Sequence, residues 1–174
     1  HYLLPFLKKF NAENPGITIH ITNQKSFEIV KMLKSGEIDL GLVNLPLEDP
    51  KLRLTQVMQI HDCFVVGEKY RELSNQPISL KKLSKYPLMF IEKGSNSRSI
   101  IEKLFLDNKV RMNPSIELGN FELLTQFAEI DFGVACIIKE FFKKDFDEGK
   151  IFEVPLKENI PTRGIGVASL KMVP

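Results

Sequence analysis

Residues 33–43 read Leu-Lys-Ser-Gly-Glu-Ile-Asp-Leu-Gly-Leu-Val, and this stretch decides the fold class. Apolar side chains recur at helical spacing up to Leu33, which predicts a helix that stops at Gly36. Residues 40–43 then form a short, continuous apolar run, a pattern typical of a parallel strand covered on both faces. A helix followed directly by such a strand indicates an α/β protein.

The chain before this stretch predicts a second helix and a second strand. Residues 2–10 place four apolar side chains on one helical face, and Asn14-Pro15-Gly16 ends that helix. Residues 17–22 alternate Ile with Thr and His, which predicts a half-buried strand. The order helix, strand, helix, strand indicates a parallel sheet with crossover connections.

The chain after residue 43 repeats this rhythm. Apolar runs predict strands at 63–66, 88–91, 115–118, 133–138, 151–154 and 165–168, with helices at 79–83, 100–105, 121–129 and 141–146. The leftover last strand indicates that the chain returns to its first half. We therefore predict an α/β fold of two Rossmann-like lobes joined by two crossing strands, with a cleft between them. Lobe I comprises residues 1–65 plus 162–174, and lobe II comprises residues 66–161.

Composition restricts the classes of partner. The 174 residues carry a net charge of +2 and show no basic stripe interleaved with aromatics, which argues against direct DNA binding by this segment. No apolar run is long enough to span a membrane, and no signal peptide is visible. Cys63 and Cys136 lie in apolar runs and are interpreted as core residues in a reducing compartment; a redox pair is the alternative.

Five ordered blocks of the sequence resemble the effector-binding domain of LysR-type transcriptional regulators. They are Tyr2-Leu-Leu-Pro with Asn14-Pro15-Gly16, the stretch 33–43, Ile78-Ser-Leu-Lys-Lys-Leu with Tyr86-Pro-Leu, Phe132-Gly-Val-Ala-Cys-Ile-Ile, and Gly149-Lys-Ile-Phe-Glu-Val-Pro. Their order and spacing along nearly the whole chain carry the resemblance.

The resemblance implies a fold like that of type II periplasmic binding proteins and a cleft that senses a small molecule. It also implies a winged helix-turn-helix DNA-binding domain upstream, a homodimer or homotetramer, and a cytoplasmic location. The family's first strand and final helix have no counterpart here, so we expect this sequence to be part of a longer protein. The helical segments 3–10 and 121–129 have apolar faces that are core or, alternatively, a dimer surface.

Candidate ligand-binding residues follow from the sheet geometry. In open α/β sheets, ligands lie beyond the carboxyl ends of strands, where helix N-termini favour anions. The side chains in that position are Asn23, Ser26, Asn44, Ser95, Asn96, Ser97 and Asn120. For Ser26 and Asn120, a helix-capping role is the alternative, and for Asn44 a turn. Arg98 is interpreted as a solvated surface residue, with pairing to an anionic effector as the alternative.

Catalytic and cofactor signals are weak. His1, His20 and His61 have no Cys or carboxylate partner at metal-ligand spacing, and Gly164-Ile-Gly166 lacks the rest of a phosphate-binding motif. Ser95 lacks the context of a nucleophile elbow. We therefore predict no catalytic residue, metal or cofactor. The alternatives to a regulatory sensor are an extracytoplasmic solute-binding protein of the same fold and a small α/β enzyme.

Overall fold

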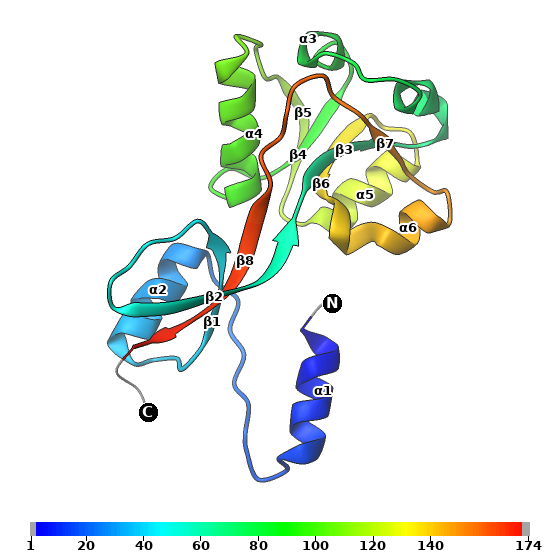
Figure 1. Cartoon of the computed structure of the whole chain (residues 1–174). Coiled ribbons are helices and arrows are strands. Elements are labelled where there is room, and N and C mark those ends of the chain that lie inside the picture. The colour runs from blue at the N-terminus through cyan, green and yellow to red at the C-terminus, as the bar shows by residue number, and fades with distance from the viewer. Residues whose placement is uncertain (1–2, 172–174) are drawn as a thin grey trace.

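The computed structural model describes residues 3–171, which form two separate β-sheets with flanking helices (Figure 1). The smaller sheet has the order β1-β8-β2, with all neighbours antiparallel. Its strands are β1 (Gly41–Leu45), β2 (Leu52–Ile60) and β8 (Arg163–Leu170), and helix α2 (Ser26–Ser35) packs on it. We call this unit lobe I.

The larger sheet has the order β5-β4-β6-β3-β7, and with its helices we call it lobe II. Strand β4 is parallel to β5 and β6, whereas β3 is antiparallel to β6 and β7. The strands are β3 (Asp62–Val66), β4 (Leu88–Ile91), β5 (Pro114–Leu118), β6 (Val134–Ile138) and β7 (Phe152–Val154).

Helices cover both faces of the lobe II sheet. On one face, the sheet forms a core cluster with three helical segments, namely the 3-10 helix η1 (Glu68–Ser74), α3 (Leu80–Leu83) and α4 (Asn96–Asp107). Helix α5 (Phe121–Glu129) and the 3-10 helix η2 (Lys139–Phe142) contribute to the core cluster of the other face, followed by α6 (Lys143–Asp147). Cys63 and Cys136 are buried in different clusters, so they face opposite sides of the sheet, and burial raises the pKa of both thiols. They are core residues, as predicted.

The chain crosses between the lobes twice, once from β2 to β3 and once on the way into β8 (Figure 1). The return of the last strand to the first sheet is as predicted. Strand β3, however, hydrogen-bonds within lobe II, whereas the sequence analysis places residues up to 65 in lobe I. Residues 1–2 and 172–174, also assigned there to lobe I, lie outside the described residues.

The parallel arrangement predicted for residues 40–43 is wrong. Strand β1 pairs antiparallel with β8, and its side chains alternate: Leu42 is exposed while Val43 is buried. One face of the strand packs on Leu33 of α2 and the other faces away from this core. The partner strand lies more than a hundred residues further on, so the local apolar run could not reveal its direction.

The strand predicted at residues 17–22 is also absent. Helix α1 (Leu4–Glu13) and residues 14–22 after it stand apart from both lobes (Figure 1). Ile17, Ile19 and Ile21 are all exposed, and no strand of the described chain pairs with them. Alternation favours a strand only where a neighbouring strand satisfies the backbone hydrogen bonds.

Strand β2 was missed by the sequence analysis. Its alternation begins at Leu52 and Leu54 but is interrupted by a register shift between Gln56 and Met58. At that point polar Gln56 takes the place of an apolar residue and apolar Val57 follows it, which hides the period of two in the sequence. The remaining predicted strands and helices are confirmed within a few residues, although α4 begins earlier, at Asn96.

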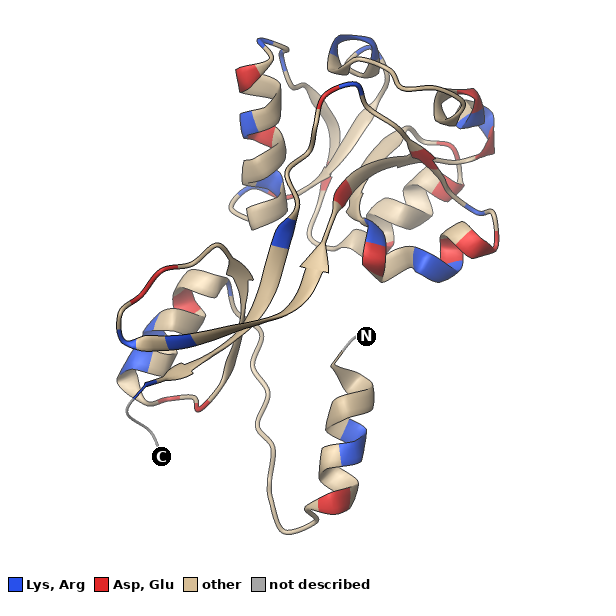
Figure 2. Cartoon of the chain, viewed as in Figure 1, with Lys and Arg blue, Asp and Glu red and all other residues tan. Residues whose placement is uncertain are grey.

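Acidic and basic residues are interspersed over both lobes (Figure 2). Within residues 3–171, no helix combines the length and apolar composition that crossing a membrane requires.

We expect Gly133→Ala to destabilise lobe II. A Cβ at this position, just before β6, would lie 2.3 Å from the backbone oxygen of Pro87, so the backbone at one of the two residues must shift. Overpacking of this kind lowers the free energy of unfolding by about 1–3 kcal/mol, measurable by urea denaturation. Gly119→Ala is the matched control, because no atom lies within 4 Å of its Cβ. Equal losses for the two variants would contradict the expectation.

Candidate functional site

Two neighbouring hollows lie between the lobes and share Lys25, Leu42 and Ser95 among their lining residues. The main cleft has a volume of about 1340 Å³. Its lining includes Asn23–Lys25 before α2, Leu42 and Ile165 of the lobe I sheet, and Ser95 and Asn120 of lobe II. The side cleft, of about 720 Å³, lies between the start of α2, the end of β1 and the start of α4. The side cleft falls within the range of about 300–1,000 Å³ that is typical of small-molecule sites, and the main cleft exceeds it.

Six of the seven candidate residues line these hollows. The main cleft includes Asn23 and Asn120, the side cleft includes Ser26, Asn44 and Asn96, and Ser95 lines both. Ser97 is buried, at 4% exposure, and lies beneath the surface rather than on it. The structure therefore brings together residues from four distant segments of the chain.

Ser95 is the N-cap of helix α4. Its Oγ accepts a hydrogen bond of 3.1 Å from the backbone N–H of Arg98. The helix therefore begins at Asn96, four residues before the start predicted at residue 100. An accepted bond leaves the Ser95 hydroxyl proton to donate elsewhere, so capping and ligand binding are compatible.

Asn120 caps helix α5 in the same way, with its Oδ1 accepting from the N–H of Leu123 at 2.8 Å. The capping alternative is thus confirmed for Asn120. Ser26 does not cap α2 through its side chain; instead its Oγ accepts from the backbone N–H of Asn44 at 3.0 Å and from Asn44 Nδ2 at 3.3 Å. This pair fixes the end of β1 against the start of α2.

The interpretation of Arg98 as a solvated surface residue is wrong. The residue is only 3% exposed and contacts the protein on several sides. Its guanidinium donates to Glu102 at 2.8 Å, to Glu117 at 3.0 Å and to the backbone oxygen of Ile91 at 3.1 Å. Arg98 therefore joins α4 to β4 and β5, and holds the start of α4 at the rim of the cleft.

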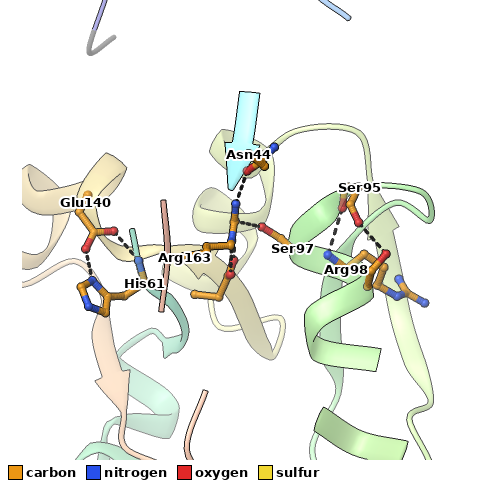
Figure 3. A network of polar contacts seen from close by, with 9 residues as sticks. Asn44, His61, Ser95, Ser97, Arg98, Glu140 and Arg163 are labelled. Carbon is orange, nitrogen blue, oxygen red and sulfur yellow. Dashed lines mark hydrogen bonds and ion pairs between the residues drawn. The ribbon is translucent and has the colours of Figure 1, made fainter. Parts of the chain in front are cut away.

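The polar centre of the site is a residue that the sequence analysis missed, Arg163 at the start of β8 (Figure 3). Its Nε and Nη2 donate to the two oxygens of Asp62 at 2.7 and 3.1 Å. It also donates to Asn44 of lobe I and to Ser97 of lobe II. The Arg163 and Asp62 side chains are 4% and 0% exposed. One guanidinium thus contacts both crossing strands and both lobes.

Two further missed residues flank this centre. Lys25, before α2, approaches the lobe II loop so closely that a Cβ on Gly94 would lie 3.0 Å from its Nζ. On the other side, Glu140 of η2 accepts from the backbone N–H of His61 at 2.9 Å and contacts His61 Nδ1 at 2.5 Å (Figure 3). Burial raises the pKa of Glu140, but the His61 hydrogen bonds outweigh it and hold this pKa below its usual value.

No described group of residues has the composition of a metal site: across residues 3–171, no three His, Cys, Asp or Glu side chains gather to hold an ion. Of the three histidines weighed as metal ligands, His1 lies outside the described residues. The clefts offer hydroxyl and amide groups together with charged side chains of both signs. The cations are Lys25, Lys144 and Lys150, and the carboxylates are Glu92, Glu122, Glu129 and Asp145 in the main cleft and Glu28, Glu48 and Asp49 in the side cleft.

Removing one partner of the buried ion pair is expected to destabilise the protein strongly. Arg163→Met leaves the Asp62 carboxylate buried without a counter-charge, which costs about 3–5 kcal/mol of unfolding free energy. The double variant Asp62→Leu, Arg163→Met should recover most of this loss. As a control, Lys139→Met breaks the exposed Lys139–Glu153 pair and should cost under about 1 kcal/mol. Urea denaturation measures all three, and equal losses for both single variants would contradict the expectation.

Comparison with known proteins places these features in a family. The family model described as "LysR substrate binding domain" matches residues 1–172. An uncharacterized HTH-type transcriptional regulator, YeiE of Escherichia coli K12, is 21% identical over 155 residues, which cover 88% of this chain and 53% of that protein. The chain spans about half the length of the curated relatives it matches.

Solved structures show the same fold. The regulatory domain of Synechocystis CcmR in complex with 2-PG superposes with a TM-score of 0.83 at 21% identity, covering 99% of this chain and 84% of that one. The effector binding domain of QuiR in complex with shikimate gives a TM-score of 0.77 at 18% identity, covering 100% and 83%. The two-lobed architecture predicted from the sequence is confirmed, and the chain belongs to the LysR substrate binding domain family.

Proposed function

We propose that this chain is the sensing part of a bacterial LysR-type transcriptional regulator, and that it binds a small anionic metabolite between its lobes. The observation that carries the proposal is the convergence of hydrogen-bonding side chains from both lobes on the clefts, with Asn44 and Ser97 held by one arginine. The proposed ligand-binding residues are Asn23, Ser26, Asn44, Ser95, Asn96, Ser97 and Asn120. Ser97 acts from below, through Arg163.

Two features favour an anion. Ser95 and Asn120 stand at the N-termini of α4 and α5, where the helix dipole is positive. Lys25 adds a full positive charge at the junction of the two hollows. The structurally similar CcmR and QuiR domains carry 2-PG and shikimate respectively, which supports a small-molecule ligand here too.

Signalling follows from differential affinity. A ligand that contacts both lobes stabilises the arrangement in which both sets of contacts are made, and so shifts the population of lobe orientations. We propose that the lobes move as units about the crossing between Ile60 and Asp62, rather than about residue 65. In the whole protein this shift would change the placement of an N-terminal helix-turn-helix domain on DNA.

The proposal extends to the setting of the whole protein: a cytoplasmic homodimer or homotetramer without catalytic activity, metal or cofactor. Membership of a regulator family supports a sensor over an extracytoplasmic solute-binding protein or an enzyme. Leu4, Phe10 and Ile21 are exposed on α1 and the segment after it, which supports a self-association surface there.

A thermal-shift screen against bacterial metabolites tests the sensor. A ligand at a hundred times its dissociation constant should add about 2.7 kcal/mol of stability. Ser95→Ala should abolish the ligand-induced shift, but it also removes a helix cap worth about 1 kcal/mol. Ser79→Ala is the matched control, because Ser79 caps α3 outside both clefts and its loss should leave the ligand response intact. If no metabolite raised the melting temperature of a folded sample, the proposal would be contradicted.

Light scattering coupled to size exclusion tests the surface on α1. Leu4→Glu should reduce the apparent mass toward that of a monomer, because a buried charge in an apolar contact is unfavourable. Lys8→Glu on the same helix introduces the same side chain at a basic position and serves as the control. An unchanged mass for Leu4→Glu would exclude α1 from the interface.

A further inference from the structure

The hydrogen bonds around Arg163 have a fixed direction. A guanidinium carries only donors, so the atom of Asn44 that faces it must be the amide oxygen Oδ1. The Asn44 Nδ2 group then points the other way and donates to Ser26 Oγ at 3.3 Å. Arg163 therefore determines which end of the Asn44 amide lies toward the side cleft.

The direction continues into Ser26. Its Oγ accepts from the backbone N–H of Asn44 and from Asn44 Nδ2. A hydroxyl has two acceptor lone pairs and one proton, so two accepted bonds leave only donation to a third partner. Nδ2 of Asn44 carries a second proton beside the one given to Ser26. Both Ser26 and Asn44 line the side cleft, so each offers it a donor.

We propose that Arg163 is a positioning residue that sets the hydrogen-bond polarity of the side cleft, turning Asn44 and Ser26 into donors that select an oxyanion. Asp62 holds the guanidinium in place through two bonds, and Arg163 itself stays beneath the site. The inference rests on the proposed function. It explains how the same site would bind an anion in preference to a cation or to a neutral ligand with few hydrogen-bond acceptors.

The charges around the side cleft are compatible with this selection. Lys25 lines it and supplies a cation. Of the carboxylates that line it, Asp49 is paired with Lys34 at 2.7 Å and Glu28 with Lys31 at 3.7 Å. Glu48 opposes an anion, so Glu48→Gln should tighten anion binding.

The decisive variant is Asn44→Asp. An aspartate keeps an acceptor for Arg163 and leaves the backbone N–H bond to Ser26, so the fold should persist. Its second oxygen replaces the Nδ2 donor, which reverses the polarity at this position and adds a negative charge. The probe is inorganic phosphate, followed by ¹H–¹⁵N spectra that include side-chain amides, with tetramethylammonium chloride at equal ionic strength as the cation probe.

In the parent chain, phosphate should shift the Asn44 side-chain amide resonances saturably, and tetramethylammonium should not. Asn44→Asp should weaken phosphate binding by about tenfold or more, as loss of a charge-assisted hydrogen bond predicts. Asn75→Asp is the control, because Asn75 is exposed at the end of η1 and lies outside both clefts. This variant makes the same exchange and should leave phosphate binding unchanged.

Arg163→Lys tests the positioning role directly. A lysine preserves the charge beside Asp62, but its single nitrogen lacks the guanidinium geometry that reaches Asn44 and Ser97 together. The Asn44 amide resonances should move before any phosphate is added, and phosphate should bind more weakly. A destabilised core alone would not explain the loss of phosphate binding expected for Asn44→Asp, where Arg163 remains.

Three results would overturn the proposal: no saturable phosphate response in the parent chain, an equal response to tetramethylammonium, or undiminished phosphate binding in Asn44→Asp. The metabolite screen has a separate outcome. A metabolite that stabilises the parent chain while phosphate binding is unaffected by Asn44→Asp would retain the sensor and reject the role of Arg163. Selective phosphate binding that Asn44→Asp weakens, without any metabolite that stabilises the chain, would retain the role of Arg163 and reject the proposed sensor.

Discussion

The two-lobed arrangement depends on a buried positive charge at the place where the chain passes between its sheets. Arg163 is removed from water, so its N–H groups need acceptors within the protein. Asp62 supplies two oxygens, and Asn44 and Ser97 supply one each. Because Asp62 begins β3 and Arg163 begins β8, this requirement keeps the two crossing strands side by side. The lobes on either side then face each other across a cleft of defined composition.

The need of backbone N–H groups for hydrogen-bond acceptors explains why the cleft is polar although both lobes have apolar cores. Helices α4 and α5 start at its edge, and their unpaired backbone N–H groups require caps. Ser95 and Asn120 provide these caps with acceptor oxygens and keep their protons available. Structure and recognition therefore use different ends of the same side chains. A capping residue at a cleft is not excluded from binding by its structural role.

Local pattern predicted those elements whose boundaries are set by near neighbours. Helix α5 was placed correctly because Asn120 caps it and its apolar residues repeat at helical spacing. Polar Gln56 and apolar Val57 interrupt the alternation of β2 and conceal it. The alternation at residues 17–22 is misleading because a strand also needs a partner. The polar loops of the cleft were found by the same local logic. Arg163 was not, since its partner Asp62 is 101 positions away and no sequence period connects them. Arg98 was misjudged for a related reason: its burial depends on β5, a separate segment.

The place of β8 in its sheet has a consequence for the synthesis of the chain. All five strands of lobe II lie in one continuous stretch, from β3 to β7, so this lobe has every strand it needs once residue 154 has left the ribosome. Lobe I does not, because β8 is the central strand between β1 and β2. Until it emerges, β1 and β2 have no common partner and their edges stay open to other chains. Vectorial folding therefore completes lobe II first, and lobe I waits longest in a state that chaperones would recognise.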